Sequence, residues 1–470
     1  MKSQPLTLLA TMLVVAVSVS LGWAQQDGGG SPAQAQSADQ TNSSQAKSQD
    51  AYQPEKVDAD TRPLSGSEYL SLGTPERARN VLKASIRADE RVDSNPSSNG
   101  TGYSWQADTD VYGDLNLNRS WKRNSFTAEY DGGGTFYGGT DAQTFQFLKL
   151  AQVFAWDRWT VTLTDQATYS PESPFGYAGP VTYTTTFVGT NIILIPNQTI
   201  LTGESARVSN TSIGEADYAL NRRSSLTGIA SYGVLDYFAG GVVNSNQING
   251  SLGYNYKLTP HSKLALGYGY EEIRFPFDPN KVSKTEFQTP SISYAYQRTG
   301  RLSFQVTGGA QLARSISPGF PTPSNTFPYA QGVVSYAWHR TLVTLLGSRS
   351  VLSGGGLYPA THTTLAQLSL ARTLSRKWDG GVMGGFAQNS PLREYEFGPI
   401  PAQKSHAAYV SLDVHRSIGR YAGLYFIYSF QRQVVNNFCT GSLCAQDFLR
   451  HSFGVGFDWR FRPITFHVKD

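Results

Sequence analysis

A strict two-residue alternation near the end of the chain limits the possible folds more than any other feature. In the stretch 448–466, FLRHSFGVGFDWRFRPITF, apolar side chains alternate with small, polar or charged ones: Phe453, Val455, Phe457, Trp459 and Phe461 against Ser452, Gly454, Gly456, Asp458 and Arg460. Successive side chains of a strand point to opposite faces, so one face of this strand is wholly apolar. A tilted strand of about 10 such residues spans a bilayer. The stretch is therefore predicted to be a membrane-crossing strand.

The same alternation recurs along the chain from Arg79 onwards. No later stretch approaches the roughly 20 apolar residues that a membrane helix needs, and only a closed barrel pairs every backbone group of strands in lipid. Counting the copies gives about 18 strands, with 16 as the lower bound, and bacterial barrels have even numbers. We therefore predict an all-β fold, a single transmembrane antiparallel up-and-down β-barrel over residues 79–466. A soluble β-sandwich is the alternative, but it would need a second sheet of equal size to bury this apolar face.

The connections between the predicted strands also alternate. Short, mostly basic turns near positions 121, 158, 222, 260, 299, 340, 376 and 418 separate longer connections rich in Gly, Pro and Asn. Outer-membrane barrels place short turns in the periplasm and long loops outside, so both termini are predicted to be periplasmic. Five tryptophans lie near the short-turn ends and suit an aromatic girdle: Trp156, Trp159, Trp338, Trp378 and Trp459.

The N-terminal residues predict export. Lys2 precedes an apolar run from Leu6 to Leu21, and Gly22-Trp23-Ala24 gives a small-x-small cleavage site, so residues 1–24 are predicted to be a cleaved signal peptide. An uncleaved anchor is the alternative. Residues 25–78 are rich in Gly, Ser, Gln, Ala and Asp, which predicts a disordered periplasmic tail.

Composition excludes some classes of function. The net charge of +4 is small for 470 residues and does not indicate nucleic-acid binding. Cys439 and Cys444 lie in the loop CTGSLC, and two close cysteines in an exported protein predict a disulfide. That loop has no His or further Cys, so no metal site is predicted, and no motif indicates a cofactor.

Charged residues on the face opposite the apolar one are the candidates for the lumen. They are Lys83, Arg87, Asp89, Asp110, Asp114, Glu129, Lys257, Lys263, Glu271, Asp413, Asp458 and Arg460. Closure of the barrel would make the first and last strands neighbours, which would bring Asp458 and Arg460 to Lys83 and Arg87. Rings of one sign select ions, so this mixed set predicts weak selectivity or neutral polar solutes. Simple pairing across strands that stiffens the wall is the alternative role.

Enzymatic chemistry is not predicted. Ser411, Asp413 and His415 share one strand face, but strand rise places the first and last about 13 Å apart. A nucleophile and its base must lie within about 3 Å, so this trio is no triad.

The export signal, the repeated alternation and the asymmetry of the connections resemble those of Gram-negative porin-like outer-membrane barrels, over Arg79 to Phe461. The size and strand number are also similar to those of sugar-specific porins and exopolysaccharide-export barrels. The resemblance implies contact with outer-membrane lipid and insertion by the barrel assembly machinery, although the chain ends on His467 to Asp470 rather than on the usual Phe. By the same analogy the chain is a homotrimer or a monomer.

The longest connection, 170–211, is the third long one, and loops of this length tend to be functional or disordered. In general porins the third loop folds inward, so the resemblance implies a constriction here, with Glu172, Phe175, Tyr177, Glu204 and Arg207 as candidate residues. A loop that only caps the barrel is the alternative.

These features lead to one preferred function and two alternatives. The preferred one is a channel for passive diffusion of small hydrophilic solutes. The alternatives are an exopolysaccharide-export barrel whose N-terminal tail contacts periplasmic partners, and a plugged structural or adhesive barrel.

Overall fold

The structure is a computed structural model that describes residues 80–95, 104–137, 143–170, 182–186, 189–193, 206–238, 244–276, 284–298, 301–316, 324–354, 358–392, 404–436 and 447–466. The predicted signal peptide and tail, Cys439 and Cys444 lie outside these residues. No helix in the described part of the chain is long and apolar enough to span a membrane.

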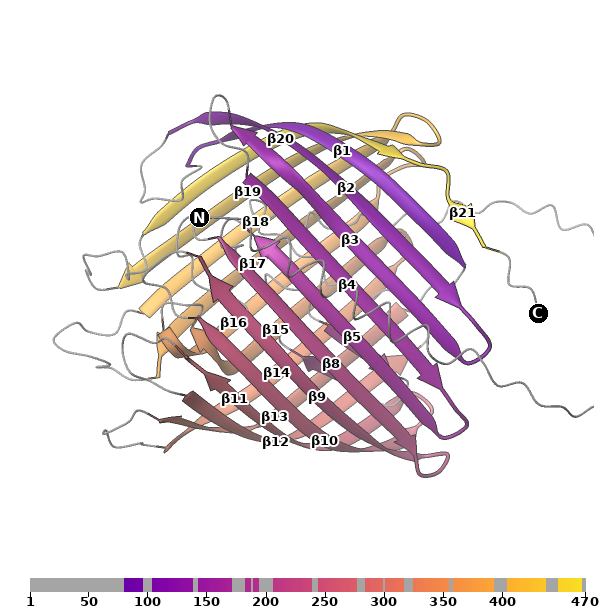
Figure 1. The fold of residues 1–470 in the computed structure, drawn as a ribbon, viewed down its shortest axis with the longest axis vertical. Helices are drawn as coiled ribbons and strands as arrows, with labels where there is room; N and C mark the ends of the chain where they lie inside the picture. The colour runs from indigo at the N-terminus through magenta and orange to yellow at the C-terminus, as the bar shows by residue number, and fades with distance from the viewer. Residues whose placement is uncertain are drawn as a thin grey trace, which may run out of the picture. The chain divides into compact units, whose positions relative to one another are not determined.

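The wall is a closed barrel of 18 antiparallel strands, which confirms the predicted fold class (Figure 1). Its strands are β1 (Val81–Asp93), β2 (Gln106–Ser120), β3 (Asn124–Tyr137), β4 (Gln143–Ala155), β5 (Trp159–Ser170), β8 (Arg207–Ala219), β9 (Ser224–Tyr237), β10 (Ser245–Thr259), β11 (Ser262–Arg274), β12 (Lys284–Arg298), β13 (Leu302–Ile316), β14 (Ser324–Trp338), β15 (Thr341–Gly354), β16 (Tyr358–Thr373), β17 (Trp378–Pro391), β18 (Lys404–Ser417), β19 (Ala422–Asn436) and β20 (Phe448–Arg460). A separate hairpin is formed by β6 (Thr182–Thr186) and β7 (Gly189–Ile193).

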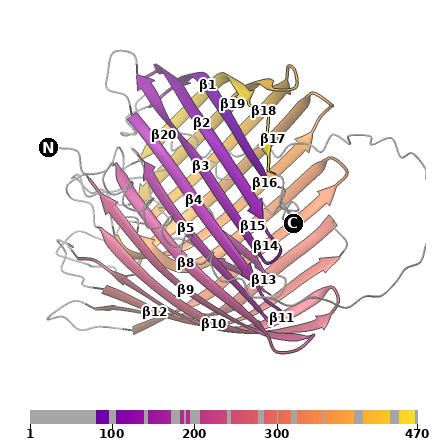
Figure 2. The ribbon, with the colours of Figure 1, turned by 45° about the vertical axis from the view of Figure 1, so that its right-hand side comes forward.

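Each strand pairs with its neighbours in the sequence, and the first and last strands close the barrel. In the register of β1 with β20, Arg87 lies opposite Asp458, whereas Arg460 lies opposite Ser85 rather than Lys83. The short strand β21 (Ile464–Thr465) continues the pairing with β1 at Val81 and Leu82. Figures 1 and 2 show the indigo N-terminal and yellow C-terminal strands side by side at this seam.

The alternation assigns the two faces of the wall as predicted. Large apolar side chains that alternate onto the outer face are exposed, for example Leu252, Leu266 and Val455. The five tryptophans expected in the girdle are also exposed. Short connections occur at all eight predicted positions, such as 121–123 and 339–340. Of the non-glycine residues that the structure describes, His339 has a positive φ, of 51°, because its hairpin turns within two residues. We call the two ends of the barrel the short-turn end and the long-connection end.

Candidate functional site: the lumen

The charged side chains of the lumen gather on one part of the wall. All twelve predicted lumen charges alternate onto the inner face. Nine of them lie on β1, β2, β3, β18 and β20, which surround the closing seam: Lys83, Arg87, Asp89, Asp110, Asp114, Glu129, Asp413, Asp458 and Arg460. The other three, Lys257, Lys263 and Glu271, lie on β10 and β11, away from the seam. We call the part around the seam the charged wall.

At the long-connection end, the charged wall contains buried ion pairs. Arg91 Nη2 lies 2.9 Å from an Asp110 carboxylate oxygen and 3.4 Å from one of Asp89, and these side chains are at most 2% exposed. Arg450 pairs with Asp93 at 2.5 Å, also in a buried setting. Removing one partner of such a pair leaves a buried charge and typically costs about 3–5 kcal/mol. These pairs therefore hold β20, β1 and β2 together from the inside.

Sequence reasoning missed Arg91, Asp93 and Arg450. The two-residue alternation through Asp89 continues to Arg91 and Asp93, so the first strand is longer than its predicted apolar face indicated. Arg450 lies two residues before Ser452, where the clear alternation of the last strand begins, and therefore on the same face. The long-connection end of both seam strands could thus have been predicted from the inner face, where polar residues keep the two-residue period.

Towards the short-turn end, the side chains of the ion pairs are more exposed. Arg87 lies 3.9 Å from Asp114, and Lys149 lies 3.5 Å from Glu129. Asp458 accepts a hydrogen bond from Arg460 Nε at 3.1 Å and lies 2.8 Å from His415 Nε2. His415, considered above with Ser411 and Asp413, therefore contacts a carboxylate two strands away rather than a residue of its own strand.

Three glycines allow long side chains to cross a neighbouring strand on the inner face. The Tyr425 ring lies over Gly456 and donates a hydrogen bond to Asp89 at 2.8 Å. The Tyr409 ring lies over Gly385 and donates to Gln367 at 2.6 Å. His415 passes over Gly423 to reach Asp458 in the same way. Each contact links strands that are not adjacent, which stiffens the wall.

Alanine in place of Gly456 should therefore destabilise the barrel. Its Cβ would lie 2.5 Å from both the Tyr425 ring and Asp89 Cβ, so one of them must move, at a cost of about 1–3 kcal/mol. Urea unfolding of the protein in lipid vesicles measures this loss. Gly253→Ala is the control, since its nearest contact would be an ordinary 3.7 Å. Equal stability of the two variants would contradict the close packing of Tyr425.

The part of the wall formed by β12 to β16 is neutral. The inward-facing positions of β12 to β16 that the structure describes carry no charged side chain. They carry mainly hydroxyl and amide groups, many of them paired with each other, such as Ser293 with Thr307 at 2.9 Å and Ser335 with Thr344 at 3.3 Å. The lumen is therefore polarised, with a charged wall on one part and a neutral polar wall on another.

The long-connection end of β15 and β16 leaves the wall and lies against the lumen face of its neighbours. Pairing of β14 with β15 stops at Ala330 and Arg349, although both strands continue beyond these residues. Val351 alternates onto the outer face, yet its side chain is only 1% exposed. Its backbone N–H donates to Gln311 Oε1 at 2.7 Å, and the Gln311 amide donates to its carbonyl at 3.3 Å. Because Gln311 faces inward on β13, this end of β15 crosses β14 on the lumen side.

A small apolar core holds this inward-folded end in place. It consists of Ile273, Phe275, Phe287, Ala313, Val351 and Ala360, all at most 5% exposed, with Phe327 and Leu392 packed against it. His362 of β16 stacks on Phe327 with ring centroids 5.4 Å apart and accepts a hydrogen bond from Arg349 at 3.2 Å. The inward-folded end, residues 350–354 and 358–362, is thus docked by packing and hydrogen bonds.

Of the five predicted constriction residues, the structure describes one. Glu172, Phe175, Tyr177 and Glu204 lie outside the described residues. The placement of Arg207 in the loop was wrong, because Arg207 is the first residue of β8 and its buried side chain contacts Tyr237. Its strand begins before the apolar alternation becomes visible, so the connection between β5 and β8 covers 171–206. In the described part of the chain no group of three or more His, Cys, Asp or Glu is arranged to hold a metal ion.

Comparison of the sequence with family models and with curated proteins finds no match. Among solved structures, the fold aligns with a BenF-like porin from Pseudomonas fluorescens Pf-5 and with the outer membrane protein OpdK from Pseudomonas aeruginosa, each at 9% identity and TM-score 0.41, covering 81% of this chain and 99% of the other. It also aligns with the FrpB iron transporter from Neisseria meningitidis, at 8% identity and TM-score 0.37, covering 81% of this chain and 82% of the other.

The barrel itself defines the fold of this chain. Its 18 strands are antiparallel and closed, with apolar residues outside and polar residues inside. This is the architecture of porin-like outer-membrane β-barrels, which the sequence resembles.

Proposed function

We propose that the chain is an outer-membrane channel for passive diffusion of small hydrophilic solutes. The observation that carries this proposal is the combination of an apolar outer belt with an inner face on which hydroxyl, amide and charged groups outnumber apolar side chains. A water-filled lumen is the usual reason for a barrel interior of this kind. The predicted export signal and the exposed tryptophans of the predicted girdle support the location.

The inward-folded end of β15 and β16 narrows the pore in this proposal. It supplies backbone and side-chain volume inside the lumen and is held by its own apolar core. The connection 171–206, with Glu172, Phe175, Tyr177 and Glu204, remains a second predicted constriction.

The polarised lumen favours polar solutes of low net charge. Several charges of the charged wall are paired with each other, for example Arg91 with Asp110 and Lys149 with Glu129, which weakens the field that they exert on a passing ion. The neutral wall offers donors and acceptors to hydroxyl and amide groups. A solute with both kinds of group contacts both walls.

Single-channel recording in a planar bilayer tests this function. The refolded protein should give steady currents, and in a salt gradient the reversal potential should stay close to zero because the wall charges are mixed in sign. A deletion within 171–206 should raise the current if that connection also narrows the pore. A reversal potential near the limit for a pure cation or anion channel would contradict the weak selectivity.

A plugged structural barrel is the second candidate, and the burial of inward-facing groups favours it. Thr361 is fully buried and Gln433 is 1% exposed, although both alternate onto the lumen face. No current from the folded wild-type protein, together with no current after the deletion, would support this candidate and contradict the channel.

A further inference from the structure

One part of the outer, lipid-facing surface is hollowed where small residues meet. Across β8, β9 and β10 the outward positions in mid-strand are occupied by small residues: Gly214, Ala216, Gly228, Ala230 and Gly250. The register places Gly214, Ala230 and Gly250 in one row and Ala216 and Gly228 in the next. Leu266 on β11 and Ile292 on β12 are large outward side chains, whereas β13 and β14 carry small outward residues again at Gly308, Ala330 and Gly332.

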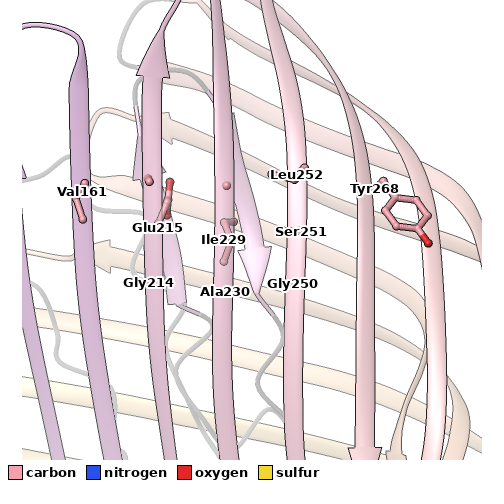
Figure 3. Close-up of a pocket in the computed structure, with 11 residues that line it drawn as sticks. Val161, Gly214, Glu215, Ile229, Ala230, Gly250, Ser251, Leu252 and Tyr268 are labelled. Atoms are coloured by element: carbon pink, nitrogen blue, oxygen red, sulfur yellow. The ribbon is translucent and has the colours of Figure 1, made fainter.

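These small residues form the floor of a depression in the outer surface, with a volume of about 600 Å³. Val161 of β5 borders it on one side, and Leu252 and Tyr268 border it on the other (Figure 3). Within a membrane, helices and strands associate by close packing, and small residues let another backbone or side chain approach. The depression therefore has the shape of a packing site.

A carboxylate faces outward on β5, two residues from Leu163, which lies opposite Gly214 of the depression. Asp165 of β5 is opposite Ser212 of β8 in the register, accepts a hydrogen bond from its hydroxyl, and accepts another from the Asn210 amide at 3.2 Å. Trp159 begins the same strand at the short-turn end. With the usual strand rise and tilt, Asp165 then lies about 15 Å further into the bilayer.

A carboxylate at this depth indicates contact with protein rather than lipid. Ionisable residues in the hydrocarbon region are costly and pair with polar groups. A carboxylate has about four acceptor sites, and lipid tails offer no donors to the sites that Asn210 and Ser212 leave. The polar character also extends to the neighbouring strands, where Tyr130 donates a hydrogen bond to Gln146 on the outer face.

We propose that this face binds a second copy of the chain across a twofold axis that runs along the membrane normal between β5 and β8. Beside the depression, Leu148, Leu150 and Leu163 on β4 and β5 form a ridge of large outward side chains. A twofold contact brings the same patch of both copies together. It therefore places each ridge in the other copy's depression and Asp165 beside the amide and hydroxyl groups of the other β8. The contact lies outside the lumen and does not depend on the proposed channel function.

Filling the depression tests the contact. The full-length protein, refolded in lipid nanodiscs, should have the mass of two copies by native mass spectrometry. Gly250→Trp should leave single copies, because the new ring occupies the space of the ridge. Gly308→Trp is the matched control, since Gly308 also faces outward on β13 and, like Gly250, has nothing within 4 Å of an added Cβ. That variant should keep the mass of two copies.

Cysteine cross-linking tests the symmetry in a background where Cys439 and Cys444 are replaced by serine. Ser212→Cys lies next to the proposed axis and should give a covalent dimer on oxidation, whereas Ala330→Cys, outward on β14, should not. A wild-type monomer, a trimer, or equal cross-linking at both positions would overturn the proposal. A monomer with a bound lipid that is lost in Gly250→Trp would also overturn it, because the depression would then be a lipid site.

Discussion

Arginine in place of Gly308 should lower the free energy of unfolding of the barrel by about 2–4 kcal/mol, the usual cost of a basic residue facing lipid at the bilayer midplane. Gly308 lies in mid-strand on β13 opposite the exposed Ile292, so its side chain would enter the hydrocarbon region. An added Cβ there meets nothing within 4 Å, which excludes a steric cause for the loss. Urea unfolding in lipid vesicles, followed by tryptophan fluorescence, measures the effect.

The matched control changes the same residue type to the same side chain on the other face. Gly269 lies in mid-strand on β11 and faces the lumen, where an added Cβ would meet Ser251 and Thr289 at ordinary distances of 3.9 and 4.0 Å. Glu271 lies two residues further on the same face and offers a partner of opposite charge. Gly269→Arg should thus be tolerated with a change below about 1 kcal/mol. Equal losses for both variants would contradict the assignment of the two faces.

Alanine in place of Phe287 should open the pore. Phe287 is fully buried at the centre of the apolar core that holds the inward-folded end of β15 and β16. Truncating a buried Phe typically costs about 3–5 kcal/mol, which is comparable with the packing that a short docked segment makes. The segment should therefore detach part of the time, and single-channel conductance should rise with larger fluctuations of the open current.

Two further variants make this result specific. Gln311→Ala removes both hydrogen bonds to the Val351 backbone and should raise the conductance in the same direction. Phe386→Ala removes an aromatic ring that is 47% exposed on the outer face and should leave the conductance unchanged. If Phe287→Ala and Gln311→Ala conduct like the wild-type protein, the inward-folded end does not limit the pore.

Most of the wall was predictable because the two faces of a membrane barrel require different side chains, which alternate along each strand. A period of two tells which side of the sheet each residue occupies, and lipid on one side with polar groups on the other makes that period visible. Val455 and Gly454 were assigned to opposite faces in this way. Antiparallel order and closure then make the first and last strands neighbours, because only these two are left to pair, whereas the register that sets Arg87 opposite Asp458 comes from the structure.

The pairing partners within the lumen could not be predicted from the alternation alone. The two-residue period assigns each residue to a face of the wall but not to a position along the barrel axis. The pairing of Arg91 with Asp110 therefore follows only from the register of β1 with β2. The contact of Tyr425 with Asp89 depends on Gly456 lying between them, which again is a matter of register. Arg207 was misplaced because a strand end with polar residues on both faces has no visible period.

Amino-acid sequence by itself determined the barrel, its strand number, the sides of its wall and the positions of its short turns, because each depends on local alternation or on local turn composition. Tertiary structure alone decided that the ends of β15 and β16 fold inward. Val351 and His362 have the period of lipid-facing residues, yet they pack on Gln311 and Phe327 of strands that are distant in sequence. The same holds for the depression on β8 to β10, since five small residues from three strands become one surface only after the register aligns them.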